Sequence, residues 1–122
     1  MFKSSNNIGK LGEDLACEYL VKKSYKILAR NYRKKWGEID IISRASDKTL
    51  IFVEVKTLAG DGELSPEDNL TAAKLKKTKR ACEAFALHNQ DLINGKKGWR
   101  IDLIAITLGN GDRPEIRHYE NI

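Results

Sequence analysis

The chain has 122 residues, of which 41% are hydrophobic and 32% are charged, with a formal net charge of +5. This length suits one domain with a core of moderate size, and the apolar fraction argues against disorder. No apolar run approaches the roughly 20 residues that a membrane-spanning helix needs, and the N-terminus lacks the apolar segment of a signal peptide. Cys17 and Cys82 form no metal-binding or redox motif. We therefore expect a single cytoplasmic domain over residues 1–122, with reduced cysteines and no membrane association.

Hydrophobic periodicity predicts a first helix over residues 7–23, after a start signal at Asn6 and Asn7. The members of its apolar stripe are Ile8, Leu11, Gly12, Leu15, Ala16, Tyr19 and Leu20. Glu13 falls at the margin of this stripe, since residues of a helix are spaced by 100°. Its carboxylate should therefore lie at the edge of the core.

Three strands should follow, at residues 25–32, 36–44 and 49–57. After a glycine-containing loop, Ser65, Pro66 and Asp68 provide the N-cap, the first-turn proline and the first-turn acid of a second helix that should run to His88. The residues that should face inward from this helix are Leu75, Thr78, Cys82 and Phe85, while Lys76, Lys79, Arg80 and Glu83 should point away.

The stretch at residues 98–108 is almost continuously apolar, which predicts a strand buried on both faces. Residues 115–119 can add a short edge strand. The order helix, three strands, helix and one or two strands predicts an α/β fold with a mixed sheet of four to five strands flanked by helices, in which a meander precedes a crossover helix.

The second and third strands carry acids where a simple hairpin would carry only apolar or β-branched residues. Alternation along a strand predicts that Ile39 and Ile41 share one face, meeting the apolar face formed by Ile51, Val53 and Val55. The remaining residues, Glu38, Asp40 and Ile42 opposite Leu50, Phe52, Glu54 and Lys56, should share the other face. A five-residue turn over 45–49 would pair Asp40 with Glu54, whereas a two- or four-residue turn would place them on opposite faces.

Two facing carboxylates repel each other unless a cation lies between them. Mg²⁺ fits such a pair, because it takes one or two carboxylates, keeps several waters and binds phosphate oxygens. Lys56 lies two residues after Glu54 on the same face, where its ammonium can hold an attacking water and stabilise charge on a phosphate.

Asp40 followed by the segment VEVK, with Glu54 and Lys56, resembles the core of the PD-(D/E)XK nucleases, although Ile39 stands where the proline of that motif would be. Four blocks extend the likeness over nearly the whole chain: GKLGEDLACEYL, ILARNYRKKWGEIDII, LIFVEVKT and WRIDLIAI. Together they resemble the YraN-like proteins, a poorly characterised bacterial family similar to archaeal Holliday junction resolvases. The resemblance implies a restriction-endonuclease-like fold with a central mixed sheet.

The resemblance also implies roles for individual residues. Asp40 and Glu54 would be metal ligands with the Val55 carbonyl as a third, Lys56 would be the catalytic lysine, and Glu13 would be an accessory acid. The implied activity is metal-dependent hydrolysis of phosphodiester bonds in DNA, with Mg²⁺ or Mn²⁺ as cofactor.

Two runs without any acid, residues 19–37 and residues 74–80, could attract a polyanion. Within them Lys34, Lys35, Lys74 and Lys77 are candidate contacts to branched or duplex DNA, although such faces can also be merely solvated. Symmetric cleavage of a junction would call for a homodimer, for which the segment 115–122 offers an edge strand.

Asp102 is two residues from Arg100 on one strand face, which favours a structural ion pair over catalysis. Two other functional classes stay open beside the endonuclease. One is a nucleic-acid-binding module on a nuclease fold without turnover, and the other is a protein-interaction domain. The latter predicts no salt-dependent affinity for DNA.

Overall fold

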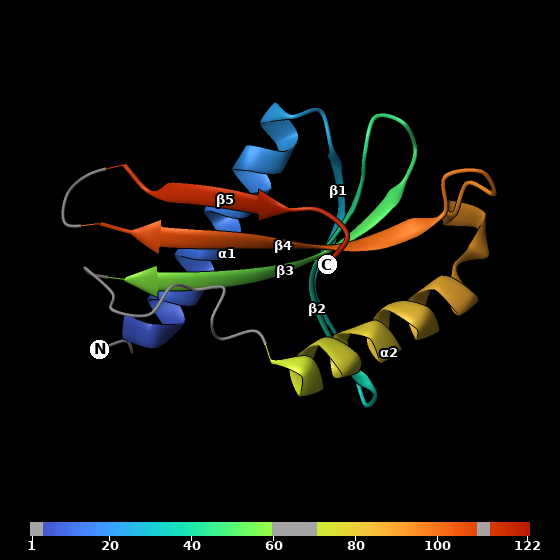
Figure 1. The fold of residues 1–122 in the computed structure, drawn as a ribbon, viewed down its shortest axis with the longest axis horizontal. Coiled ribbons are helices and arrows are strands. Elements are labelled where there is room, and N and C mark those ends of the chain that lie inside the picture. The colour runs from blue at the N-terminus through green and yellow to red at the C-terminus, as the bar shows by residue number, and fades with distance from the viewer. Residues whose placement is uncertain (1–3, 60–70, 110–112) are drawn as a thin grey trace.

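A computed structural model describes residues 4–59, 71–109 and 113–122 and contains two long helices and a five-stranded sheet (Figure 1). The elements are α1 (Ser4–Lys22), β1 (Lys26–Lys34), β2 (Gly37–Arg44), β3 (Leu50–Ala59), α2 (Ala72–His88), a short 3₁₀ helix η2 (Gln90–Leu92), β4 (Trp99–Leu108) and β5 (Glu115–Tyr119). The order αβββαββ confirms the α/β fold, and the optional edge strand is present. The arrangement is consistent with a restriction-endonuclease-like core.

The strands lie in the order β1-β2-β3-β4-β5. The first three form an antiparallel meander because short turns join them. The connection through α2 brings β4 parallel to β3, and β5 then returns antiparallel to β4. The sheet is therefore mixed, as the sequence predicts. Within the described ranges, neither helix is long and apolar enough to cross a membrane.

Each face of the sheet carries its own apolar layer under one helix. Ala16 and Leu20 of α1 pack on Ile41, Ile51 and other residues of one face, and in Figure 1 α1 passes behind β3, β4 and β5. The layer under α2 comprises Ile39, Ile42, Leu50, Phe52, Ala81, Cys82, Phe85 and Ile101. Residues 101–106 of β4 are all buried, which confirms that this strand contributes to both layers.

Helix α1 lies close to β3 at Gly12. A Cβ atom at this position would lie 1.8 Å from Oγ1 of Thr57 in β3, so only glycine fits. The apolar stripe of α1 is narrower than predicted: Gly12, Ala16 and Leu20 are buried, but Leu11 is 47% exposed. The prediction for Leu11 was wrong because the close approach at Gly12 turns the neighbouring position away from the sheet.

The prediction that Ile39 and Ile41 share a face was also wrong. Ile41 packs in the layer under α1, whereas Ile39 packs under α2. The pairing of β2 with β3 ends at Ile41 and Val53. One position further, the Asp40 carboxylate accepts the N–H of Val55. Regular alternation therefore stops at Asp40, where β2 leaves β3.

Helix α2 begins at Ala72 after Thr71, whose hydroxyl accepts the N–H of Lys74 at 3.1 Å. The described helix is thus shorter than predicted, and the start signal at 65–68 lies outside the described residues. Its buried residues are Thr78, Ala81, Cys82, Phe85 and Ala86, with Leu75 half-buried. The predicted inward face is confirmed and widened by two alanines. Both cysteines are free thiols.

Candidate functional site

The β2–β3 turn sets the position of the two central carboxylates. Arg44 pairs with Leu50, so five residues form the turn, and Asp47 closes it by accepting both the N–H and the hydroxyl of Thr49. Of the turn lengths that the sequence left open, the structure has the five-residue turn over 45–49. The register continues to Ile41 and Val53, so Asp40 and Glu54 occupy the next position on each strand.

Asp40 lies at the point where β2 separates from β3. Its Oδ2 accepts the N–H of Val55 at 2.8 Å, in place of a backbone bond between the strands. Burial and the charge of Glu54 raise the pKa of Asp40 to about 7, and Glu13 adds to this rise. The opposing effects of the Val55 N–H and of Lys74 are smaller. Asp40 and Glu54 are therefore close enough to repel each other.

Glu54 is 5% exposed and contacts two lysines. Lys74 of α2 places its Nζ 2.9 Å from Oε2 of Glu54, and Nζ of Lys56 lies 3.5 Å from the same oxygen. Burial and the neighbouring Lys74 lower the pKa of Lys56. A buried carboxylate with two ammonium groups on one oxygen is a concentrated set of charges, and Lys56 is the lysine that loses its proton more easily.

These residues line one open cavity of about 670 Å³ between α2 and the β1–β2 turn. Its lining comprises Lys35, Trp36, Gly37, Glu38, Asp40, Glu54, Val55, Lys56, Lys74, Lys77, Thr78 and Arg80. Five of these side chains are cationic and three are acidic, and of the acids Glu54 is buried, Asp40 is half-buried and Glu38 is exposed. The cavity can therefore accept an anionic ligand while its base carries oxygen ligands for a cation.

Gly37 holds the β1–β2 turn against α2 and so forms one wall of the cavity. Its φ of +145° disfavours any residue with a Cβ. A Cβ here would lie 3.0 Å from that of Ala81 and 3.3 Å from the carbonyl oxygen of Lys77. The close approach is visible where the turn after β1 meets α2 (Figure 1).

Glu13 reaches this region from the other helix. It is partly buried, and its Oε1 lies 3.7 Å from the guanidinium of Arg30, which also bonds Asp14 at 2.8 Å. Its charge acts on Asp40. The structure thus places Glu13 at the core edge, as predicted, but it is not among the residues that line the cavity.

The predicted lysines divide into two groups. Lys35, Lys74 and Lys77 line the cavity, whereas Lys34 places its ammonium over the ring of Tyr32, 5.7 Å from the ring centroid. Five lining residues were not assigned to the site from the sequence, namely Trp36, Gly37, Glu38, Thr78 and Arg80. Arg80 was expected to point away, although its spacing of three from Lys77 is a helical signal, and Trp36 appeared only as an aromatic within a basic run.

A magnesium site would use Asp40, Glu54 and the Val55 carbonyl. The N–H and C=O of one residue in an extended strand point to the same side, so the Val55 carbonyl faces the side of Asp40. Within the described ranges, no three His, Cys, Asp or Glu side chains are arranged to hold a metal. Two carboxylates and a carbonyl, completed by waters, nevertheless fit Mg²⁺, and a cation would offset the two main causes of the raised pKa of Asp40, which are burial and the charge of Glu54.

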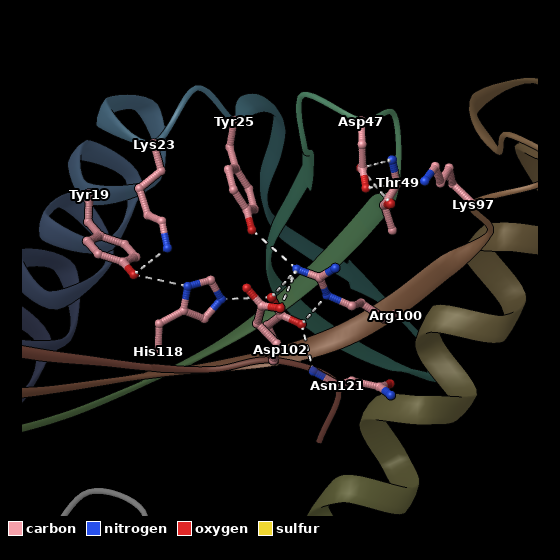
Figure 2. Close-up of polar contacts among 11 residues, drawn as sticks. Tyr19, Lys23, Tyr25, Asp47, Thr49, Lys97, Arg100, Asp102, His118 and Asn121 are labelled. Atoms are coloured by element: carbon pink, nitrogen blue, oxygen red, sulfur yellow. Dashed lines mark hydrogen bonds and ion pairs between the residues drawn. The ribbon is translucent and has the colours of Figure 1, made fainter.

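A second polar cluster surrounds Asp102, on the sheet face under α1 (Figure 2). The buried carboxylate accepts hydrogen bonds from Nε of Arg100 at 2.9 Å and from the backbone N–H of Asn121 at 3.0 Å. It also forms a hydrogen bond with Nε2 of His118 at 2.7 Å. Burial raises the pKa of Asp102, but these hydrogen bonds outweigh it and the net pKa is lowered. The predicted pairing with Arg100 is confirmed.

The cluster extends to the helix and to β1. Arg100 donates to the hydroxyl of Tyr25 at 3.2 Å, and Nδ1 of His118 bonds the hydroxyl of Tyr19 at 3.1 Å. Figure 2 shows these side chains converging from α1, β4, β5 and the segment before β1. Asp102 and its partners therefore fasten the C-terminal strand to the rest of the fold, and His118, which had no predicted role, belongs to this structural network.

Comparison with known proteins identifies the family. The family model described as "Uncharacterised protein family UPF0102" matches residues 12–106. A UPF0102 protein of Thermotoga neapolitana is 41% identical over 99 residues, covering 80% of this chain and 85% of the relative. A UPF0102 protein of Geobacter sulfurreducens is 40% identical over 115 residues, covering 93% of this chain and 86% of the relative. A UPF0102 protein of Mycobacterium marinum is 38% identical over 115 residues, covering 91% of this chain and 89% of the relative. The chain therefore belongs to the uncharacterised protein family UPF0102.

Proposed function

We propose that the protein is a metal-dependent endonuclease of the PD-(D/E)XK superfamily that hydrolyses phosphodiester bonds in DNA. The observation that carries the proposal is the carboxylate pair of half-buried Asp40 and buried Glu54 on neighbouring strands, with Lys56 beside Glu54, in a cavity lined by four lysines and an arginine. Burial and the repulsion from Glu54 raise the pKa of Asp40, so the ionised pair lowers stability at neutral pH. Binding of a cation and a phosphate gives this costly arrangement a function.

Each group of site residues has a different proposed role, which follows from its position in the cavity. Asp40, Glu54 and the Val55 carbonyl would hold Mg²⁺ or Mn²⁺, which when bound supplies Lewis-acid polarisation of a phosphate oxygen. Lys56, whose pKa is lowered, can hold the attacking water by a hydrogen bond and stabilise charge on the phosphate. Lys35, Lys77 and other cations of the cavity wall draw the DNA backbone towards the carboxylates.

Cleavage assays with purified protein test the proposal. Duplex, single-stranded, flap and four-way-junction DNAs are incubated with Mg²⁺ or Mn²⁺ and the wild type, Asp40→Ala, Glu54→Ala or Lys56→Ala. Each variant should lose roughly 100-fold or more in rate. Lys79→Ala, an exposed lysine of α2 outside the cavity, should cleave like the wild type. Absence of cleavage by the wild type, or equal cleavage by Asp40→Ala, would count against the proposal.

One observation favours a second function, a nucleic-acid-binding module without turnover. Lys74 already neutralises Glu54 at 2.9 Å, so the cavity can be electrostatically balanced without a metal. This alternative predicts salt-dependent DNA binding by the wild type that needs no divalent cation and yields no product. Magnesium titration of the wild type and of Asp40→Ala separates the two functions, because only the endonuclease loses a metal-binding signal on substitution.

Assembly is part of the proposal. Two cuts placed symmetrically in a junction require two active sites related by a two-fold axis, and β5 lies at an edge of the sheet where a second chain could pair. Light scattering at micromolar concentration, with and without junction DNA, should show a doubled mass in at least one condition. A monomer in both conditions would argue against symmetric cleavage of a junction and would leave nicking of one strand as the expected activity.

A further inference from the structure

Trp36 is an exposed aromatic residue at the cavity, with no ring contact to any other aromatic side chain in the described part of the chain. Ring contacts join Tyr32 to Phe85, Phe85 to Phe52 and Phe52 to Trp99, all edge-to-face in the layer under α2. Within the described ranges, no such contact involves Trp36, which is 46% exposed in the turn between β1 and β2. Its indole is therefore available to a ligand.

The position of Trp36 links this exposed ring to the proposed site. It lines the same cavity as Asp40, Glu54 and Lys56, and Lys35 precedes it in the chain. Contact of Gly37 with Ala81 fixes the turn against α2, so the indole is presented from a constrained backbone. An aromatic face beside cationic side chains is the combination that proteins use for single-stranded nucleic acid, with the ring stacking on a base and the cations contacting phosphates.

We infer that Trp36 stacks on an unpaired base next to the scissile phosphate, so that the site selects DNA with single-stranded segments, such as flaps, over continuous duplex. The inference rests on the proposed function. In a continuous duplex both faces of every base are already stacked, so a new contact with Trp36 requires an existing stack to be broken. At a flap or in a single strand that face is free. Stacking then strengthens binding by roughly 5- to 150-fold per base.

The chain allows a direct optical test, since Trp36 and Trp99 are its only tryptophans. In the Trp99→Phe background, the emission of Trp36 is recorded while DNA is added in EDTA, where no metal-dependent cleavage proceeds. Three probes of equal length and sequence are compared: a single strand, a duplex with a three-nucleotide flap and a continuous duplex. Trp36 emission should be quenched by the first two at concentrations well below those needed for the duplex.

Affinities of variants then separate stacking from charge. Trp36→Ala should weaken binding of the single strand and the flap by about 5- to 150-fold and binding of the duplex by less than about 3-fold. Trp36→Phe, which keeps a ring, should restore most of the difference. Because the ring lies outside both apolar layers, thermal unfolding of the two variants should match that of the wild type.

Each outcome decides the inference. Equal loss of affinity for all three probes, no loss for any, or unquenched emission on saturation would overturn the stacking role while leaving the nuclease proposal standing. If the wild type binds none of the three probes, the result contradicts both this inference and the proposal that the protein acts on DNA. Discrimination against duplex that survives in Trp36→Ala would assign the preference to other residues and overturn the inference.

Discussion

Replacing Asp40 by asparagine should stabilise the metal-free protein at neutral pH while removing its response to magnesium. Asp40 faces Glu54 on β3, Glu13 on α1 and Lys74 on α2, and its pKa is raised to about 7 from an ordinary value of 3.8. The folded state therefore holds its proton more tightly than the unfolded chain does. The resulting stability is fully present below pH 3.8 and is lost as the pH rises through about 7.

The size of the change in unfolding free energy follows from the rise in the pKa of Asp40. One pKa unit corresponds to about 1.4 kcal/mol, so raising the pH from 5 to 8 should cost the wild type about 3 kcal/mol through Asp40 alone. Asparagine at position 40 can still accept the N–H of Val55 through its side-chain oxygen but has no proton to lose. The free energy of unfolding of Asp40→Asn should then vary with pH by about 2 to 3 kcal/mol less than that of the wild type.

Urea unfolding at pH 5 and pH 8, with and without millimolar Mg²⁺, measures both parts of this prediction. Magnesium should raise the stability of the wild type at pH 8, because a ligand of the folded state stabilises it, and should have no effect on Asp40→Asn. Glu54→Gln should show an intermediate pH dependence in the absence of metal, since the charge of Glu54 is the second cause of the shift. Glu83→Gln, an exposed acid on α2, serves as the control.

Identical pH dependence of the wild type and Asp40→Asn between pH 5 and pH 8 would refute the electrostatic reasoning. Stabilisation of Asp40→Asn by magnesium equal to that of the wild type would refute the assignment of Asp40 as a ligand. The two results are independent, so the charge repulsion and the metal site are tested separately.

Three further changes test the packing and the charges. Asp102→Ala should lower the free energy of unfolding by about 3 to 5 kcal/mol, because it leaves the half-buried Arg100 and the buried side chain of His118 without their acceptor; a loss below about 1 kcal/mol in urea unfolding would contradict the role of this cluster. Gly12→Ala should cost about 1 to 3 kcal/mol through its clash with Thr57, whereas Gly9→Ala, with open space around it, should be neutral or stabilising. Similar melting temperatures for these two variants would show that the close approach is not required. Lys74→Met removes the ammonium that is ion-paired with Glu54 and should tighten magnesium binding several-fold in calorimetric titration. Unchanged magnesium affinity would argue against competition between Lys74 and the metal.

Local pattern was sufficient for much of the fold. Alternation and apolar runs predicted four strands and allowed the fifth, and the nearly unbroken apolar stretch of β4 correctly indicated burial on both faces. They also limited the β2–β3 register to a few turn lengths, of which the five-residue turn brings Asp40 next to Glu54. These features depend on periods of two and 3.6 residues and on chain length between neighbouring elements, which a sequence carries directly.

Tertiary contacts decided what those periods do not encode. Ile39 lies under α2 because β2 leaves β3 at Asp40. Lys74 reaches Glu54 because α2, which carries Lys74 twenty residues further along the chain, packs on this face of the sheet. Glycine is required at position 37 because the turn that carries Trp36 touches α2. In each case the environment of the residue depends on how whole helices and strands pack against one another. A local sequence pattern specifies only which face of its own helix or strand a residue occupies.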